Sequence, residues 1–94
     1  MKIEGIIWFD YIIEKLFIKH NVLPNEVKEI LCNKPHFRFV EKGYKYGENV
    51  YSAMGSTDNK RNLIVFFIYK KSKHALILSA RDMTKSERKL YEKI

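Results

Sequence analysis

Residues 63–80 read LIVFFIYKKSKHALILSA, and this stretch decides the fold of the chain. Its first seven residues, Leu63–Tyr69, are continuously apolar or aromatic, which is typical of a central strand buried on both faces. The basic segment Lys70–Lys73 predicts a turn, and the mainly apolar His74–Ala80 predicts a strand that returns alongside the first. Two strands with so short a link pair in antiparallel fashion.

Two further strands are expected on the N-terminal side of this hairpin. Apolar and polar residues alternate over His36–Lys42, and Arg38 there points to the face opposite the neighbouring phenylalanines. A second strand is expected over Glu48–Met54, after a turn that two glycines indicate. The segment 55–62 is polar and rich in turn-forming residues, so it should connect this strand to the central one. The four strands together predict an antiparallel meander.

Two amphipathic helices are expected before the sheet. The first spans residues 11–20, and its core-facing residues should be Ile13, Leu16, Phe17 and His20. The second should begin at Pro24, whose fixed φ suits the first helical position, and end at Asn33. Its apolar stripe should consist of Val27, Ile30 and Leu31. Cys32 lies among these residues, so we expect a small buried hydrophobe rather than a nucleophile.

The two ends of the chain complete the order of elements. Ile3–Phe9 is short, β-branched and aromatic, which favours a short strand. Thr84 and Glu87 match a capping box, in which each side chain accepts from the other's backbone N–H. A final helix is therefore expected over Lys85–Glu92. Its apolar contacts should be Leu90, Tyr91 and Ile94. This order predicts one α+β domain over residues 1–94, with two helices covering one face of the sheet.

Charge is distributed unevenly along the chain. The 18 Lys and Arg outnumber the 11 Asp and Glu, which gives a net charge of +7. Residues 1–32 carry a net charge of −1, whereas residues 33–94 carry +8. A segregated positive field attracts polyanions, so nucleic acid, an acidic protein and a membrane surface are candidate partners. Solubility alone is the simpler explanation.

The sequence gives no sign of secretion or membrane insertion. Its longest apolar run, Leu63–Tyr69, is far shorter than the ~20 residues of a membrane helix. Glu4, Asp10 and Glu14 interrupt any apolar signal-peptide segment. We therefore expect a soluble cytoplasmic protein with no membrane partner.

Motifs of several enzyme classes are absent. There is no P-loop, no G-x-S-x-G elbow and no H-E-x-x-H pair. The single cysteine excludes an internal disulfide, and His20, His36 and His74 are scattered, so neither a metal site nor a cofactor is expected. RNA cleavage needs no metal, because the 2′-hydroxyl attacks the adjacent phosphorus. A general base and a general acid move the protons, and cations stabilise the phosphoryl charge.

The C-terminal segment carries a resemblance to a known family. Residues 78–92, LSARDMTKSERKLYE, resemble the ending "ISAR-x-A-T-x-x-E-R-x-x-Y-E" of BrnT toxins. Three more matches follow the family order: Trp8–Asp10 resembles "W-D", Lys19–Val22 resembles "K-H-G-V/I", and Gly47–Tyr51 with Met54-Gly55 resembles "G-E-x-R-Y…x-G". The resemblance covers nearly the whole chain.

The resemblance implies a RelE-like α+β fold and a ribonuclease toxin of a type II toxin–antitoxin module. It also implies a protein antitoxin, BrnA, with a ribbon-helix-helix fold, which blocks the toxin. A heterotetramer with an antitoxin dimer is expected, and operator DNA would be bound only through the antitoxin. An acidic antitoxin segment and RNA would both suit the basic half of the chain.

The sequence departs from the family pattern at three positions. Asn21 replaces a glycine, which is tolerable because Asn also adopts the left-handed conformation. Val50 and Leu76 replace basic residues, whereas the basic position in the preceding turn is kept as Lys71. Two cations that could contact phosphate are thus absent. A catalytically weak or inactive module that binds RNA and antitoxin is therefore the alternative to an active endoribonuclease.

Three residues are the candidate catalytic groups. Arg81, at the end of the last strand, is expected to clamp and stabilise the phosphate, unless a salt bridge to Asp82 or Glu87 is its only role. His20 could be a general acid or base, since histidine is a residue type suited to proton transfer, or it could instead cap the first helix. Glu48 is a candidate base or an ordinary exposed glutamate. RNA-binding residues are expected to be Lys19, Lys70, Lys71, Tyr51 and Arg88.

A DNA-binding function is not favoured. The predicted helix within residues 23–33 is acidic, whereas a helix that reads the major groove should be basic. No pair of helices shows the spacing of a helix-turn-helix motif.

Overall fold

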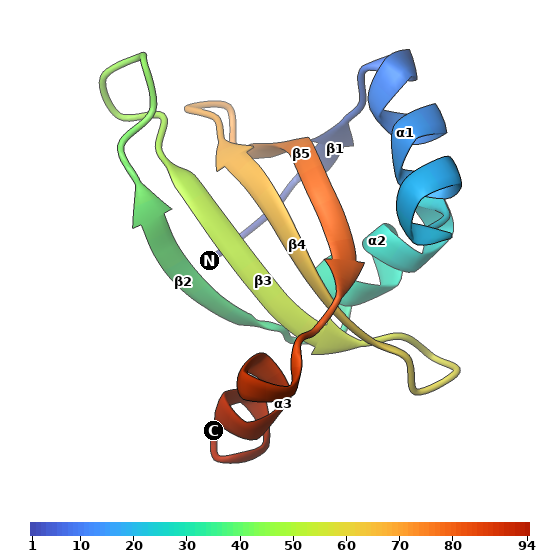
Figure 1. The fold of residues 1–94 in the computed structure, drawn as a ribbon. Coiled ribbons are helices and arrows are strands. Elements are labelled where there is room, and N and C mark those ends of the chain that lie inside the picture. Colours follow the sequence, from blue (N-terminus) through green and yellow to red (C-terminus); the bar gives the residue numbers. More distant parts are fainter.

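The computed structural model describes residues 1–94 and contains three helices and one five-stranded mixed sheet (Figure 1). Its elements are β1 (Gly5–Ile7), α1 (Asp10–His20), α2 (Pro24–Cys32), β2 (His36–Glu41), β3 (Val50–Ser56), β4 (Asn62–Tyr69), β5 (His74–Asp82) and α3 (Lys85–Glu92). The number, type and order of the elements agree with the α+β prediction.

The sheet has the strand order β1-β5-β4-β3-β2. Strands β2 to β5 form the predicted antiparallel meander, and β1 joins the outer edge of β5 in parallel. The hairpin loop between β3 and β4 is shorter than expected, because Gly55 and Ser56 pair with Leu63 and Asn62. Strand β5 is also longer than expected, since it continues beyond Ala80 to Asp82.

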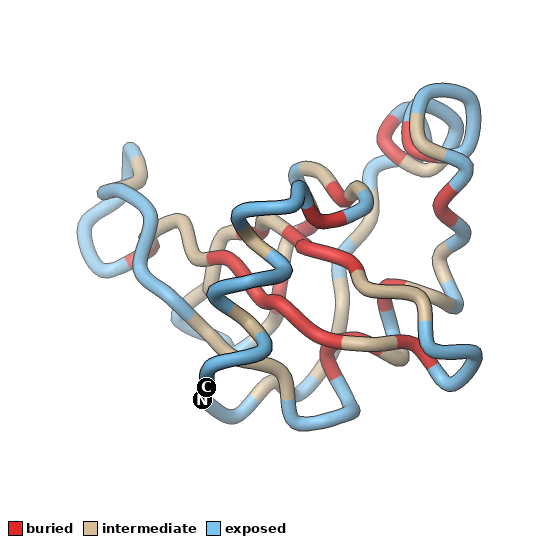
Figure 2. Tube along the Cα trace, turned by 60° about the horizontal axis from the view of Figure 1, so that its bottom comes forward, coloured by how far each residue is buried: buried red, intermediate tan, exposed pale blue.

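The main core lies between the sheet and the two N-terminal helices. α1 lies along β5, and α2, which Figure 1 shows below α1, contacts β3 and β4. Figure 2 shows that the buried residues run along the middle strands and α2. The buried residues of this main core are Ile12, Leu16, Val22, Val27, Ile30, Leu31, Ala53, Leu63, Val65, Phe67, Ala75, Ile77 and Ala80. The predicted stripe of α2 is therefore confirmed.

Two expectations about burial in the helices are wrong. In α1 the buried residues are Ile12 and Leu16, whereas Phe17 is 53% exposed. The sheet contacts a face of α1 that is rotated from the expected one, and apolar residues remain on the outer face. Cys32 is exposed, because it is the last residue of α2 and lies outside the core contact.

The third helix packs on the opposite face of the sheet, near the C-terminal end of β5. Met54, Ile64 and Met83 form a small core there, and Tyr91 of α3 packs against it. The predicted capping box is confirmed, since Glu87 N donates to Thr84 Oγ1 at 3.2 Å and Thr84 N donates to Glu87 Oε1 at 2.8 Å. α3 has no buried residue, and its expected contact Ile94 is exposed (Figure 2).

No helix of this structure combines the length and the apolar composition that crossing a membrane requires.

Candidate active site

The sheet face that α1 and α2 leave uncovered, called the open face below, has an apolar row near the β4–β5 turn. Val50, Ile68 and Leu76 are neighbours on adjacent strands of this face. The two positions where the family has basic residues therefore lie in one row, and that row carries no charge. The basic half of the chain therefore does not form a continuous cationic face: on the open face, Arg38 lies on the edge strand β2 and Arg81 at the end of β5.

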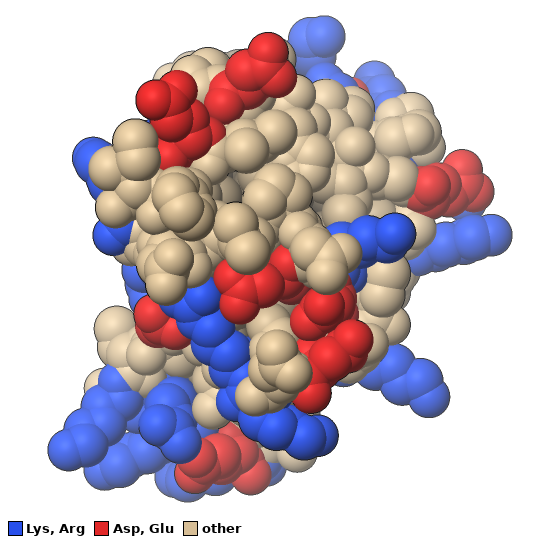
Figure 3. Space-filling view, turned by 90° about the vertical axis from the view of Figure 1, so that its right-hand side faces the viewer, with Lys and Arg blue, Asp and Glu red and all other residues tan.

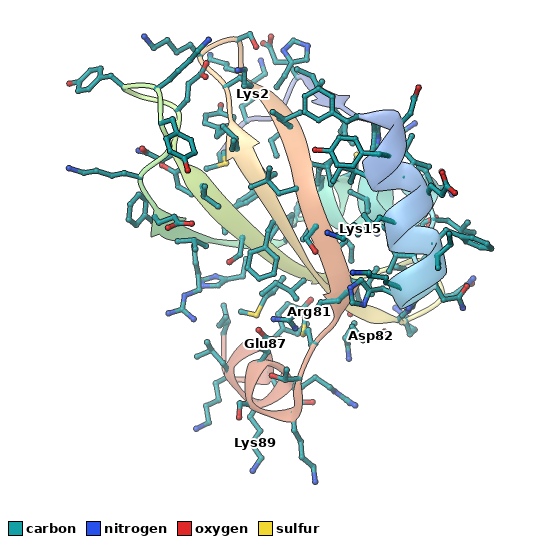
Figure 4. The ribbon with its side chains drawn as sticks, turned by 45° about the horizontal axis from the view of Figure 1, so that its top comes forward. Lys2, Lys15, Arg81, Asp82, Glu87 and Lys89 are labelled. Carbon is teal, nitrogen blue, oxygen red and sulfur yellow. The ribbon has the colours of Figure 1, made fainter.

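Arg81 lies at the C-terminal end of β5, between the sheet and α3 (Figure 4). Its Nη1 and Nη2 donate to the two carboxylate oxygens of Glu87 at 2.7 and 3.0 Å. Nη1 also donates to the backbone oxygen of Asp82 at 3.2 Å. The guanidinium carbon stands 5.5 Å from the ring centre of Phe66, which is a cation–π geometry. The salt bridge considered from the sequence is thus present.

This salt bridge uses one edge of the Arg81 guanidinium only. A guanidinium has five N–H donors arranged as two forks. Glu87 occupies the Nη1–Nη2 fork, and no protein atom accepts from Nε. The Arg81 side chain is 32% exposed, and the unpaired Nε is not a buried atom, so the second fork is accessible to solvent. Arg81 is therefore fixed in position while it keeps a bidentate donor pair available for an oxyanion.

Glu87 remains ionised over the physiological range. The hydrogen bond from Arg81 is the main cause that lowers the pKa of Glu87 from 4.5 to about 2, and the backbone N–H of Thr84 contributes. The same hydrogen bond raises the pKa of Arg81. The pair is thus a fixed zwitterion at neutral pH, and Glu87 holds the Arg81 guanidinium in its orientation.

His20 lies at the same end of β5 but on the side of α1. It is the last residue of α1, and its backbone oxygen accepts from Arg61 Nη2 at 2.9 Å. Arg61 also binds the Asp82 carboxylate, and its hydrogen bonds are the main cause that lowers the pKa of Asp82, with a smaller contribution from His20. Side chains of consecutive strand residues alternate, so Arg81 and Asp82 point to opposite sides (Figure 4).

The cations of α3 border this end of β5. Lys85, Arg88 and Lys89 lie on exposed turns of the helix, and Arg88 has one weak contact with Glu92 at 3.8 Å. Between α3 and the open face is a pocket of about 220 Å³. Its lining includes Arg38 of β2 as well as Glu87. Arginines therefore stand on both sides of the hollow, Arg38 at its β2 side and Arg81 beside Glu87.

Glu48 lies at the opposite end of the sheet. Its carboxylate accepts from Lys70 Nζ at 2.9 Å and from the backbone N–H of Lys71 at 3.3 Å, and the bond from Lys70 is the main cause that lowers its pKa. Arg81 pairs with Ile64, which in turn pairs with Met54 of β3. Glu48 precedes Met54 by about six residues, which corresponds to roughly 20 Å along the strand. Glu48 and Arg81 therefore cannot contact the same phosphate.

The predicted RNA-binding residues fall into three places. Lys19 is an exposed residue of α1 beside His20, and Arg88 is an exposed residue of α3, the helix that follows Arg81 in the chain. Lys70 and Lys71 form the distant turn beside Glu48. Tyr51 is on the helix side of the sheet, stacked on Phe67 and half-buried against the core. The structure therefore places Arg81, His20, Lys19 and Arg88 at the same end of β5, with Arg81 and Arg88 on the side of α3 and with His20 and Lys19 on the side of α1.

Arg61 is a residue that sequence reasoning missed. Its N–H groups bind the carboxylates of Glu26 and Asp82 and the backbone oxygens of His20 and Asn21. All of its donors are used, in contrast to those of Arg81. Arg61 therefore joins α1, α2 and β5 and holds His20 in place. No local motif marks it, because its partners are distant in the sequence.

The structure defines an α+β protein with a partly exposed arginine, fixed by Glu87, at the end of β5 beside the cations of α3. A family model described as "Ribonuclease toxin, BrnT, of type II toxin-antitoxin system" matches residues 13–87. The chain therefore belongs to the BrnT family of ribonuclease toxins, and the family implies an RNA substrate and a protein antitoxin. No protein with a curated description matches the chain.

Proposed function

We propose that this chain is an endoribonuclease that cleaves RNA without a metal ion, at the C-terminal end of β5. The RNA 2′-hydroxyl attacks the adjacent phosphorus, and the products are a 2′,3′-cyclic phosphate and a free 5′-hydroxyl. Arg81 binds the phosphoryl oxygens and stabilises the charge of the transition state. His20 is the proton-transferring group, and Lys19 and Arg88 bind flanking phosphates.

One observation carries this proposal, namely the free fork of Arg81. Glu87 and Phe66 restrict the guanidinium, and its Nε–H remains exposed to solvent. Donors that are already oriented stabilise a developing charge without reorganisation, which is what a phosphoryl transition state requires. A planar fork also matches two phosphate oxygens better than a lysine does.

Cleavage assays should show activity in the presence of excess EDTA. The purified chain, incubated with single-stranded RNA, should give products with 2′,3′-cyclic phosphate ends by mass spectrometry. Replacing the nucleotide 5′ to the scissile phosphate by its 2′-deoxy form should abolish cleavage there, because the nucleophile is lost. Activity that EDTA removes, or products with 5′-phosphate ends, would contradict the proposed chemistry.

A non-catalytic module is the second candidate, and the uncharged row of Val50, Ile68 and Leu76 favours it. A chain of this kind would bind RNA on its cationic ends and would not cut it. The same assay separates the candidates, since a folded chain that binds RNA and releases no cyclic-phosphate product supports the module. In the cell, expression without antitoxin arrests growth only if the chain is an active toxin.

For the protein partner, we infer a ribbon-helix-helix antitoxin that binds as a dimer between two copies of this chain. Exposed apolar residues on and before α1 offer a docking surface, namely Phe9, Tyr11, Phe17 and Ile18. Figure 3, which faces α1, shows an extensive surface without charged side chains above the lysines and arginines of the lower end. Uncovered apolar surface of this kind is typical of protein interfaces.

The antitoxin inference predicts a defined complex. Coexpressed with the antitoxin of its own module, the chain should purify at the mass of two toxin copies and one antitoxin dimer by light scattering. Ile18→Glu should weaken the complex by about tenfold or more, because it buries a charge in an apolar contact. Glu14→Ala, on the same outer face, is the control. If Ile18→Glu binds the antitoxin as tightly as the unmodified chain, the docking surface is not on the outer face of α1.

A further inference from the structure

The loop between β2 and β3 presents two tyrosines to solvent. It has the sequence KGYKYG over residues 42–47, so the tyrosines alternate with lysines. Tyr44 is fully exposed and Tyr46 is 94% exposed, and neither ring forms an aromatic pair or a hydrogen bond. Tyrosines are intermediate in burial and are seldom left wholly in water.

Contacts at both ends of this loop hold its backbone. Gly43 packs directly on the backbone oxygen of Glu48, where any side chain would collide, and its N–H reaches the Asn49 side chain at 3.4 Å. Gly47 has a positive φ of 80°, which glycine adopts at low cost. Glu48 then ties the end of the loop to the β4–β5 turn through Lys70. The structure around the tyrosines therefore holds their backbone in place.

The surroundings of the loop are cationic. Lys42 and Lys45 belong to it, and Lys71 and Lys73 lie in the adjacent β4–β5 turn (Figure 1). None of these four lysines forms an ion pair. A hollow of about 490 Å³ is lined by residues 42–47 and Asn49. Free positive charge and exposed aromatic rings thus occupy the same end of the sheet.

We infer that the 42–47 loop is a second RNA-binding site, which stacks unpaired bases of the substrate on Tyr44 and Tyr46 while the surrounding lysines hold its backbone. Aromatic rings alternating with lysines suit single-stranded RNA, because every base has a face that can stack and every nucleotide carries a phosphate. A duplex keeps its bases stacked on one another, so it offers the tyrosines no partner.

This site lies at the end of the sheet opposite to Arg81, roughly 20 Å away by the rise of the strands. The inference rests on the proposed cleavage at the end of β5, because the loop would hold a part of the same strand at a distance from the scissile phosphate. It also gives a role to Lys70 and Lys71, which cannot reach that phosphate. Lys70 fixes the loop through Glu48, and Lys71 is free to contact the RNA backbone.

The test is the affinity for a fluorescein-labelled single-stranded 2′-O-methyl oligoribonucleotide, measured by anisotropy. This probe cannot be cleaved through its 2′ oxygen, so its binding is read independently of catalysis. Replacing both tyrosines, Tyr44→Ala with Tyr46→Ala, should weaken binding by about tenfold or more. The corresponding phenylalanine pair should bind like the unmodified chain, because the rings still stack. Lys42→Ala should reduce the steepness with which the logarithm of the association constant falls with the logarithm of the salt concentration, by about 0.7 in slope.

Leu23→Ala is the control, since Leu23 is an exposed apolar residue at the start of α2, outside the loop and the proposed binding surfaces. The loop variants should have the same melting temperature as the unmodified chain, because the two rings pack against no other side chain. Duplex RNA of the same sequence should bind the alanine pair and the unmodified chain equally. Unchanged single-strand affinity of the alanine pair would overturn the inference.

A protein partner for the loop is the other outcome that the test can show. If the alanine pair loses affinity for the antitoxin and keeps its affinity for RNA, the loop belongs to the antitoxin interface and the inference is wrong. The proposed function fails by a different result, the absence of cyclic-phosphate products from the unmodified chain. The two failures are therefore distinguishable.

Discussion

Arg81→Ala should reduce RNA cleavage by about 10²- to 10³-fold and abolish growth arrest. Loss of one oriented donor to a transition-state oxyanion has an effect of this size. Arg81→Lys should recover only a part of the activity, because a lysine supplies the charge without the fork. Initial rates on a defined single-stranded RNA, with EDTA present, measure both variants.

The control for this prediction is Glu87→Gln, which breaks the same ion pair from the other side. If Arg81 serves only to hold α3 against the sheet, Arg81→Ala and Glu87→Gln should lose the same activity. If Arg81 binds phosphate, Glu87→Gln should lose clearly less activity than Arg81→Ala, because the guanidinium stays present and loses only part of its orientation. Equal losses in both variants would therefore refute the catalytic assignment of Arg81.

The elements that the sequence predicts well are those decided by neighbouring residues. The capping box of Thr84 and Glu87 is complete within one turn, so α3 begins where the pattern indicates. The apolar run of β4 and the turn after it are likewise local, and they fix the meander. Element ends depend on pairing across strands instead. Gly55 and Ser56 look like loop residues, yet they extend β3 because β4 pairs with them.

The burial of α1 shows a limit of helical periodicity. Apolar residues occur on more than one face of this helix, and the sequence does not say which face the sheet covers. The contact with β5 selects Ile12 and Leu16 and leaves Phe17 outside. A partner that covers the outer face would explain why the helix is apolar there as well.

The site could be predicted only in part for a similar reason. The Arg81–Glu87 pair was among the expected possibilities, because the end of β5 and the first turn of α3 are adjacent in the sequence. That Glu48 is remote from Arg81 follows only from the direction and register of the strands. Tyr44 and Tyr46 look ordinary in a loop, and their significance comes from their exposure beside a cationic turn.

Arg61→Ala should cost about 2–4 kcal/mol of folding free energy, the largest loss of stability that we expect from a single charged residue. The variant leaves Glu26, whose side chain is 22% exposed, without its cation, and it removes the donors to two backbone oxygens at the end of α1. Hydrogen bonds to charged groups and half-buried ion pairs each contribute at this level. The melting temperature should fall by about 10–20 °C.

The pH dependence of this loss has a definite sign. Arg61 lowers the pKa of Asp82 below its ordinary value of 3.8, so the stabilisation is complete above about pH 5 and is lost as the pH falls through the lowered pKa. The difference in urea midpoint between Arg61→Ala and the unmodified chain should therefore shrink in acid. Arg88→Ala, whose ion pair is exposed, should change stability by less than about 0.5 kcal/mol. If Arg61→Ala melts like Arg88→Ala, the three elements do not depend on this arginine for their contact, and the placement of His20 beside β5 needs another cause.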